Sequence, residues 1–535
     1  MKVERRDFMK SAALLAAAVG TPSAAFGDGC ANDATLLAVG LQKQLLLDNV
    51  LIESVQDVTR EWHQPIKHEA NPLLVKDKPW EHVVYCRSTT FRVIHDPKDG
   101  LFKCWYLDEA LTNENHRNGV VFPLYRDLYA YSKDGIHWVK PGLGIYRENG
   151  QDTNIYMGDE KNGGTGSRSV IIDPFESDEK KRFKTVYYHA SAEDYAKGQV
   201  EAAYSADGVH WTRYEEFPSF GRFGTTHNDC TNLSYDPDRR LYILTGRHPR
   251  MTRAVANPRL PKTNSFFRPF YPTDFAKMNK RRIYQSESKD LIHWNTPAEI
   301  IAPDEEDNLD DSLYGMSQYW VDGTRVGLLN VLHQVPDVLN TQLAYSLDGK
   351  CWNRVRRPWL TAGPEGSWDQ VMVEAPTPPL EMGDELWFYY GGSGYFHHDW
   401  YSFAIAENLD VAESNDISKG GFFLGLAKLR LDGFCSLNAG AVREGILITR
   451  PLVSNGPGLV MNAECAPGGY IEVEAFNATD ETFPGYSRKE FDRFTGNAVK
   501  HQLSWQSRNE IPPDAFRRFV FYMRNAKIYS LRFSG

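Results

Sequence analysis

Four acidic residues stand where their carboxyl groups could act on one substrate: Asp229, Asp311, Asp369 and Glu374. Each comes just before a short β-prone run rather than in the turn after it. Two carboxyl groups across a reacting bond can divide the work, one donating a proton while the other serves as base or nucleophile. The apolar run VMVEAP (371–376) favours the protonated form of Glu374, so we expect Glu374 to be the general acid. Asp229 is then the expected base or nucleophile, and Asp369 or Asp311 a modulator or hydroxyl ligand.

Other side chains in the same positions could bind a substrate. Two arginines suit a clamp on polar groups, and a tryptophan offers a flat face for stacking. The predicted binding residues are Arg168, Arg87, Trp368, His227 and Tyr314. Structural alternatives stay open for the acids: Asp229 and Asp369 could cap turns, Glu374 could pair with an arginine, and Asp311 ends the acidic run DEEDNLDD.

A phrase of the form Ser-x-Asp-(Gly)-x-x-Trp recurs along the chain and must help to position these residues. Its four copies are SKDGIHW (132–138), SADGVHW (205–211), SKDLIHW (288–294) and SLDGKCW (346–352). Recurrence on this scale is typical of a radially repeated β-fold. The Asp-Gly predicts a tight turn, and the Trp is expected to pack between neighbouring blades. We interpret the phrase, with its aspartates, as scaffold.

Five β-prone runs broken by an Asp-Pro or Asp-Gly type of turn predict five inner hairpins. They are residues 91–106, 169–188, 233–247, 317–333 and 378–392. We therefore predict an all-β chain with a five-bladed β-propeller over 40–438, its last blade completed by the early strand KQLLLDNVLIE. Polar residues just before the inner strands would line one axial pocket. The short alternating runs over 439–535 predict a β-sandwich.

Residues 1–29 read as an export signal. Arg5 and Arg6 precede an apolar run and then small residues at 23–25, an order typical of a twin-arginine signal peptide. The expected location is periplasmic or secreted, with lipidation at Cys30 left open. A net charge of −10 argues against a nucleic-acid partner, and no later stretch is apolar enough for a membrane span. No cofactor is expected, and a structural cation such as calcium, near His397 and His398, stays open.

The predicted architecture resembles that of glycoside hydrolase families 32, 43 and 68. The segments GLAKLRLDGFCSLNAG (425–440) and FYMRNAKIYSLRF (521–533) are similar to the C-terminal sandwich of exported bacterial family 32-like proteins. The resemblance implies hydrolysis of a glycosidic bond in a carbohydrate substrate, inside a funnel on the propeller axis. The chain lacks the Trp-Met-Asn-Asp-Pro-Asn and Arg-Asp-Pro segments of family 32, so the resemblance assigns no catalytic residue.

Several alternatives remain on the same scaffold. Carboxyl groups about 5–5.5 Å apart would indicate a retaining glycosidase and about 6.5–9.5 Å an inverting one, while wider separations would fit a non-catalytic carbohydrate-binding propeller. A sialidase-like enzyme would use an arginine triad, for which Arg87, Arg168 and Arg247 are available. A phosphorylase would need a cluster of the kind that His248, Arg247 and Arg250 could form.

Overall fold

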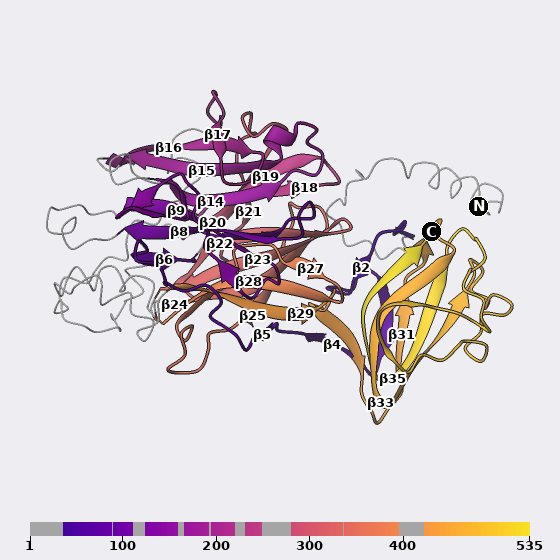
Figure 1. Cartoon of the computed structure of the whole chain (residues 1–535). Coiled ribbons are helices and arrows are strands. Elements are labelled where there is room, and N and C mark those ends of the chain that lie inside the picture. Colours follow the sequence, from indigo (N-terminus) through magenta and orange to yellow (C-terminus); the bar gives the residue numbers. More distant parts are fainter. Residues whose placement is uncertain are drawn as a thin grey trace. The chain divides into compact units, whose positions relative to one another are not determined.

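The computed structural model describes residues 36–87, 89–110, 124–158, 165–191, 194–219, 230–248, 280–334, 336, 338–394 and 422–535. Within these ranges the protein is all-β apart from one short 3₁₀ turn, η1 (Glu179–Lys181) (Figure 1). No helix there is long and apolar enough to cross a membrane. The chain divides into two compact units. Unit 1 comprises Met1–His63, Val321–Thr324 and Arg430–Gly535, and unit 2 comprises Gln64–Trp320 and Arg325–Leu429.

Unit 2 begins with three antiparallel sheets that follow one another along the chain. The first contains β6 (Val83–Tyr85), β7 (Arg92–His95), β8 (Phe102–Ala110), β9 (Leu124–Ser132), β10 (Trp138–Val139) and β13 (Ile155–Met157). The second is β14 (Thr165–Ile172), β15 (Phe183–Ser191), β16 (Asp194–Ser205) and β17 (Trp211–Arg213). The third is β18 (Asn232–Asp236), β19 (Leu241–His248), β20 (Arg282–Ser288) and β21 (Ala298–Ile301). The small hairpin of β11 (Arg147–Glu148) and β12 (Gln151–Asp152) lies between β10 and β13 in the chain.

A nine-stranded sheet holds the rest of unit 2. One half is β22 (Asp311–Val321), β23 (Thr324–His333), β24 (Val338–Ser346) and β25 (Asn353–Leu360). The other half is β26 (Met372–Glu374), β27 (Leu380–Met382), β28 (Glu385–Ser393), β29 (Phe423–Arg430) and β5 (Ile66–Lys67). The halves join through one parallel pair, Leu339 with Met372, so each is nearly a sheet of its own.

The repeated Trp phrase forms the same turn each time, which confirms its interpretation as scaffold. In the first copy the Asp134 carboxylate accepts hydrogen bonds from the Ser132 hydroxyl and from the Ile136 and His137 amides, and the equivalent bonds recur in the other three. Gly208 closes the second turn with a φ of +82°, and its carbonyl accepts a hydrogen bond from the Trp105 indole of the preceding sheet. A Cβ at Gly208 would lie 2.6 Å from that indole, so glycine is required there.

Aspartates at the inner hairpins tie each sheet to the next. Asp96 accepts hydrogen bonds from Lys103 of its own sheet and from Arg182 of the second sheet. The Asp173 carboxylate accepts hydrogen bonds from Lys184 of its own sheet and from Tyr242 of the third sheet. The Asp236 carboxylate accepts one from Arg325 of the nine-stranded sheet. Because the three carboxylates are buried, their charges need these partners, which gives the hairpin aspartates a structural role.

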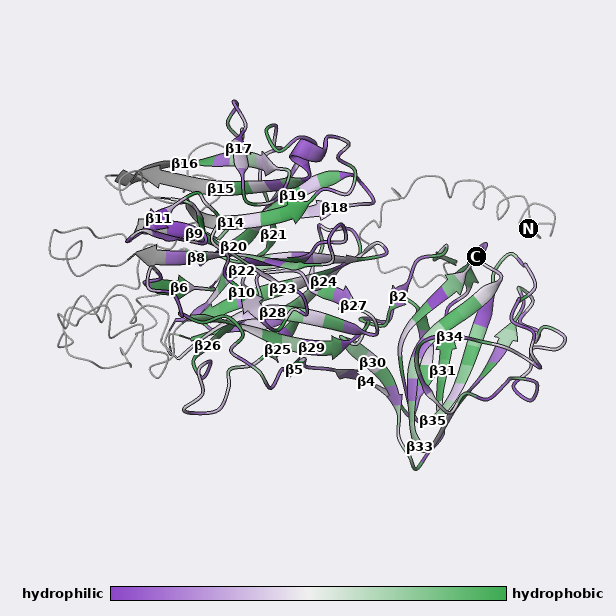
Figure 2. Cartoon of the chain, in the orientation of Figure 1, coloured by the Kyte–Doolittle hydropathy of each residue, from purple (hydrophilic) through white to green (hydrophobic). Residues whose placement is uncertain are grey.

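Unit 1 is built on one eight-stranded sheet. Its strands are β2 (Gln44–Leu45), β3 (Ile52–Gln56), β4 (Val58–Trp62), β30 (Cys435–Ala439), β31 (Gly445–Thr449), β33 (Gly458–Phe476), β34 (Asn497–Gln502) and β35 (Arg518–Ser534). A separate parallel pair joins β1 (Leu37–Ala38) to β32 (Leu452–Val453). Hydrophobic and hydrophilic bands alternate along β33 and β35, as the pleat of a half-buried strand requires (Figure 2). Phe519, Phe521 and Trp505 are fully buried in this unit.

The N-terminal strands differ from the expectation. We expected residues 43–53 to complete a blade of a domain over 40–438, but β2 pairs with β35, β3 with β31 and β4 with β30. The chain divides instead at residues 63/64 and 429/430. Leu46, Ile52 and Val58 are buried here, so their apolar side chains complete the unit 1 core. Among the described strands before β6, only the two-residue strand β5 belongs to the nine-stranded sheet, where it pairs with β29.

Candidate functional site

A buried ion pair joins Arg87, which follows β6, to Glu374, the last residue of β26. The Arg87 Nε lies 3.1 Å from the Glu374 Oε1, and the two side chains are only 4% and 2% exposed. The structure therefore brings together two of the residues predicted from the sequence. An ion pair with a guanidinium was also the structural alternative considered for Glu374.

Three arginines gather around Tyr314 of β22, a residue also predicted for the site. The guanidinium carbons of Arg87, Arg247 and Arg281 lie 5.7, 3.9 and 4.9 Å from the centroid of the Tyr314 ring. All three arginine residues are less than 9% exposed. We call Arg87, Arg247 and Arg281 the arginine cluster. Cations over a tyrosine face are attracted by the ring, which gives Tyr314 a role in holding them.

The strands around Tyr314 explain why the arginines converge. Arg247 is near the end of β19, and Arg281 directly precedes β20, its antiparallel partner, so both lie at one end of the same sheet. The Arg281 carbonyl accepts a hydrogen bond from the Leu313 amide, next to Tyr314. Apolar side chains complete the wall of the site: Val83, Cys230, Leu332, Leu339, Met372 and Phe422. Charged groups thus stand in a largely apolar setting, where electrostatic interactions are stronger than in water.

Another buried arginine, Arg92 at the start of β7, is linked through Asn232 to the segment that follows Glu374. Its Nη1 is 3.4 Å from the Asn232 Oδ1, and the Asn232 amide also donates to the Pro376 carbonyl, two residues beyond Glu374. Burial lowers the pKa of Arg92 to about 10. No described carboxylate lies within ion-pair distance of it. Arg92 is therefore a cation held inside the unit without a carboxylate partner in the described chain.

Asp311, at the start of β22, forms a dyad with a histidine. The His333 Nδ1 lies 2.6 Å from the Asp311 Oδ1, and the Asn340 amide lies 2.7 Å from the His333 Nε2. Burial alone would lower the pKa of His333, but the hydrogen bond and charge of Asp311 outweigh it, and the pKa is raised. Asp311 is thus a buried carboxylate with a defined partner, rather than part of a solvated acidic loop.

Asp369 and Trp368 lie in a different setting. The Asp369 carboxylate pairs with Lys67 of β5 and accepts a hydrogen bond of 3.0 Å from the Tyr390 hydroxyl. The Trp368 ring stacks on Tyr390 at 5.7 Å and packs against the hydrophobic core of the first sheet. Burial, followed by the charge of Asp369, raises the pKa of Tyr390. These contacts hold the segment before β26, and the predicted roles of Asp369 and Trp368 remain predictions.

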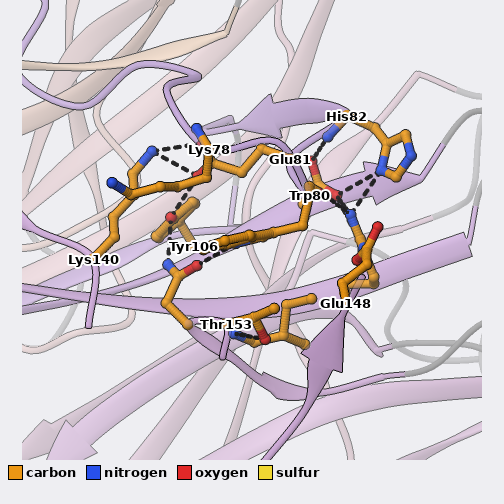
Figure 3. Close-up of polar contacts among 12 residues, drawn as sticks. Lys78, Trp80, Glu81, His82, Tyr106, Lys140, Glu148 and Thr153 are labelled. Carbon is orange, nitrogen blue, oxygen red and sulfur yellow. Dashed lines mark hydrogen bonds and ion pairs between the residues drawn. The ribbon is translucent and has the colours of Figure 1, made fainter. Parts of the chain in front are cut away.

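A second buried polar network lies in the first sheet (Figure 3). Lys140 Nζ lies 2.6 Å from the Glu81 Oε1, which also accepts a 2.8 Å hydrogen bond from the Tyr106 hydroxyl. Asn154 continues the network, because its amide donates to that hydroxyl while its Oδ1 accepts from the Trp80 indole. Every member shown has a partner inside the network, so it works as a satisfied structural core rather than as a ligand site.

Other predicted site residues cannot be placed. Asp229 and His227 lie outside the described residues, as do His397 and His398. Arg168 lies on β14 opposite Tyr187, but its side chain is outside the described part. In the described chain no three His, Cys, Asp or Glu side chains are grouped so as to hold a metal ion. Arg281 was missed in the sequence, although it precedes a strand in the same way as the residues chosen.

No protein-family model matches the chain, and no curated protein matches it. Among solved structures it is similar to an N-acetylgalactosamine deacetylase from F. plautii in complex with blood group B trisaccharide (14% identity, 71% of this chain and 97% of that one, TM-score 0.42). It is also similar to the β-1,2-mannobiose phosphorylase of Listeria innocua (12% identity, 69% and 97%, TM-score 0.44). A third similar structure belongs to work on the GH130 family of mannoside phosphorylases, which contains glycoside hydrolases that target β-1,2-mannosidic linkages in Candida mannan. The identity is 12%, the match covers 73% of this chain and 97% of that one, and the TM-score is 0.42. TM-scores below 0.5 do not establish a shared fold.

Proposed function

We propose that the protein is a glycoside hydrolase, with unit 2 as a five-bladed β-propeller and unit 1 as a β-sandwich. Three consecutive antiparallel sheets and the two halves of the nine-stranded sheet supply five sets of strands. The single parallel pair between those halves supports counting them separately. Export through a twin-arginine signal over residues 1–29, to the periplasm or outside, is part of the proposal.

Hydrogen bonds from one of these five sets of strands to another support a common axis. The Ser169 hydroxyl of β14 donates to the Thr231 carbonyl before β18, and the Thr245 hydroxyl of β19 donates to the Met316 carbonyl of β22. The Ala375 amide after β26 donates to the Thr341 hydroxyl of β24. Inner strands that meet around an axis would direct their polar side chains into one funnel.

The observation that carries the proposed activity is the Arg87–Glu374 ion pair beside Tyr314. It places a buried carboxylate where side chains from the first sheet, the third sheet and both halves of the nine-stranded sheet converge. A cation next to a carboxyl group favours its ionised form. The geometry therefore favours Glu374 as base or nucleophile over general acid.

The proton donor must then be a second carboxyl group. Among the described candidates Asp311 is buried beside His333, but the raised pKa of His333 keeps the proton of this pair on the imidazole, so Asp311 is the weaker donor. Asp229 is the other candidate, as a residue of the same predicted funnel. Two carboxyl groups on either side of the glycosidic oxygen would allow a retaining or an inverting reaction, according to their separation.

The test is hydrolysis of a panel of aryl glycosides and oligosaccharides by the purified mature protein. The variants Glu374→Gln, Asp311→Asn and Asp229→Asn are each compared with the control Glu365→Gln. Glu365 is an exposed residue on the segment leading to β26. Loss of a catalytic carboxyl group should lower kcat by about 10²–10⁴-fold, while Glu365→Gln should match the wild type. Circular dichroism checks folding, and the anomer first released separates retention from inversion.

Full activity of a folded Glu374→Gln variant would remove Glu374 from the reaction. No release from any glycoside, together with measurable sugar binding, would overturn the enzyme assignment in favour of a carbohydrate-binding protein.

A further inference from the structure

We infer that the arginine cluster binds the carboxylate of an acidic sugar, so that the substrate is a glycoside of a uronic acid or related sugar acid. The sugar part of this inference rests on the proposed function, whereas the anion-binding part does not. It is carried by the convergence of three guanidinium groups, one from the first sheet and two from one end of the third, on one aromatic ring.

The cluster has the chemistry of an oxyanion site. A guanidinium is planar and always charged, and its N–H groups match the two oxygens of a carboxylate. Three such groups within 5.7 Å of one ring centroid repel one another, and an anion bound between them would reduce that repulsion. The face of Tyr314 could lie beneath the carbon skeleton of a sugar acid, while the arginines hold its carboxylate.

Arg92 supports the inference independently. It is a buried cation whose described surroundings contain no paired carboxylate, and Asn232 links it to the segment that carries Glu374. A buried cation of this kind raises the positive potential of its neighbourhood and thereby favours an anionic ligand.

Glu374 adds a negative charge to the site through its pair with Arg87. It repels a bound anion, while the three guanidinium groups attract it, and both effects grow with the charge of the anion. The planar pair of carboxylate oxygens matches the guanidinium N–H groups, which is why we assign a carboxylate. Titration with phosphate and sulfate tests this choice.

The experiment is calorimetric titration of the mature protein with galacturonate and glucuronate, and with the neutral sugars galactose and glucose as matched ligands. Inorganic phosphate and sulfate form the other arms. We expect a uronate to bind at least tenfold more tightly than its neutral counterpart, and binding to weaken as salt concentration rises. Preferential binding of phosphate or sulfate, or equal binding of neutral sugars, would overturn the inference.

Charge-conserving variants locate the site. Arg247→Lys and Arg281→Lys keep the positive charge but lose the bidentate hydrogen bonding of a guanidinium to a carboxylate. Each should weaken uronate binding on the order of ten- to a hundredfold. The control is Arg282→Lys, the next residue along, which is partly exposed and pairs with Glu299 on the surface. Unchanged uronate affinity in folded Arg247→Lys and Arg281→Lys would place the anion elsewhere and refute the assignment.

The two proposals can fail separately. Hydrolysis of neutral glycosides without uronate binding would overturn the inference and leave the proposed function intact. Uronate binding that depends on Arg247 and Arg281, without hydrolysis of any glycoside, would sustain the anion-binding part of the inference and refute the proposed function.

Discussion

The ion pair between Asp236 and Arg325 allows a stability prediction worked from the structure. The Asp236 Oδ2 lies 2.9 Å from the Arg325 Nη2, and the side chains are 0% and 8% exposed. At an effective dielectric constant of about 20, two unit charges at this distance attract by roughly 6 kcal/mol. Desolvation offsets much of that gain, but removing one partner leaves the other buried and uncompensated. We therefore expect Asp236→Asn or Arg325→Met to lower the free energy of unfolding by about 3–5 kcal/mol.

The double variant should be less damaging than the sum of the single ones, because it leaves neither charge alone. Urea unfolding followed by tryptophan fluorescence measures this, since the tryptophans of the repeated phrase all lie in unit 2. The control is Arg282→Met, which removes an exposed ion pair with Glu299 and should cost about 0–1 kcal/mol. The reasoning would be refuted if either single variant lowered the free energy of unfolding by less than about 1 kcal/mol. It would also be refuted if the decrease in the double variant equalled the sum of the two single decreases within about 0.5 kcal/mol.

Two further predictions concern the scaffold and the Asp311–His333 dyad. Gly208→Ala should lower the thermal midpoint of unfolding far more than Gly100→Ala. Both glycines have a positive φ, but of the two only Gly208 would place a Cβ against a neighbour, the Trp105 indole. Equal decreases of the midpoint in calorimetry would contradict a steric cause. The raised pKa of His333 means that its protonation stabilises the fold fully below pH about 6.5 and that this stabilisation is lost as the pH rises through the folded pKa. His333→Gln should thus lower the midpoint more at pH 5 than at pH 9, and a pH-independent difference would show that the histidine does not titrate in this way.

The scaffold could be predicted largely because its interactions are local. The Ser-x-Asp turn is closed by hydrogen bonds within a few residues, so the sequence of one copy contains all its partners. The N-terminal strands were assigned to the other unit because their pairing is not local. A short β-prone run such as residues 43–53 could pair equally well in the sheet of unit 1 or in a sheet of unit 2. Its partners β31 and β35, which are distant in the chain, determine that it pairs in unit 1.

The site could be predicted in part for a similar reason. The rule that polar residues precede inner strands selected Arg87, Tyr314 and Glu374, which the structure brings together. It could not show that Arg87 pairs with Glu374, residues far apart in the chain. Arg281 precedes β20, outside the five predicted inner hairpins, and stands in the basic run NKRRI, where a surface role is the usual interpretation. Asp369 has its ion-pair partner at Lys67, which no sequence pattern indicates.

The pairing of the chain on both sides of the unit boundary has a consequence for how the protein folds. In unit 1, Trp62 of β4 pairs with Cys435 of β30, and in unit 2, Ile66 of β5 pairs with Lys428 of β29. The strands β2–β4 therefore leave the ribosome several hundred residues before their partners exist. Once unit 2 folds, its β5–β29 pair brings the two chain segments close, which removes most of the entropy of closing so long a loop. The strand β4 finds its partner only once β30 has been made, β3 once β31 has been made, and β2 once β35 has been made. Unit 2 is therefore expected to fold first and unit 1 last.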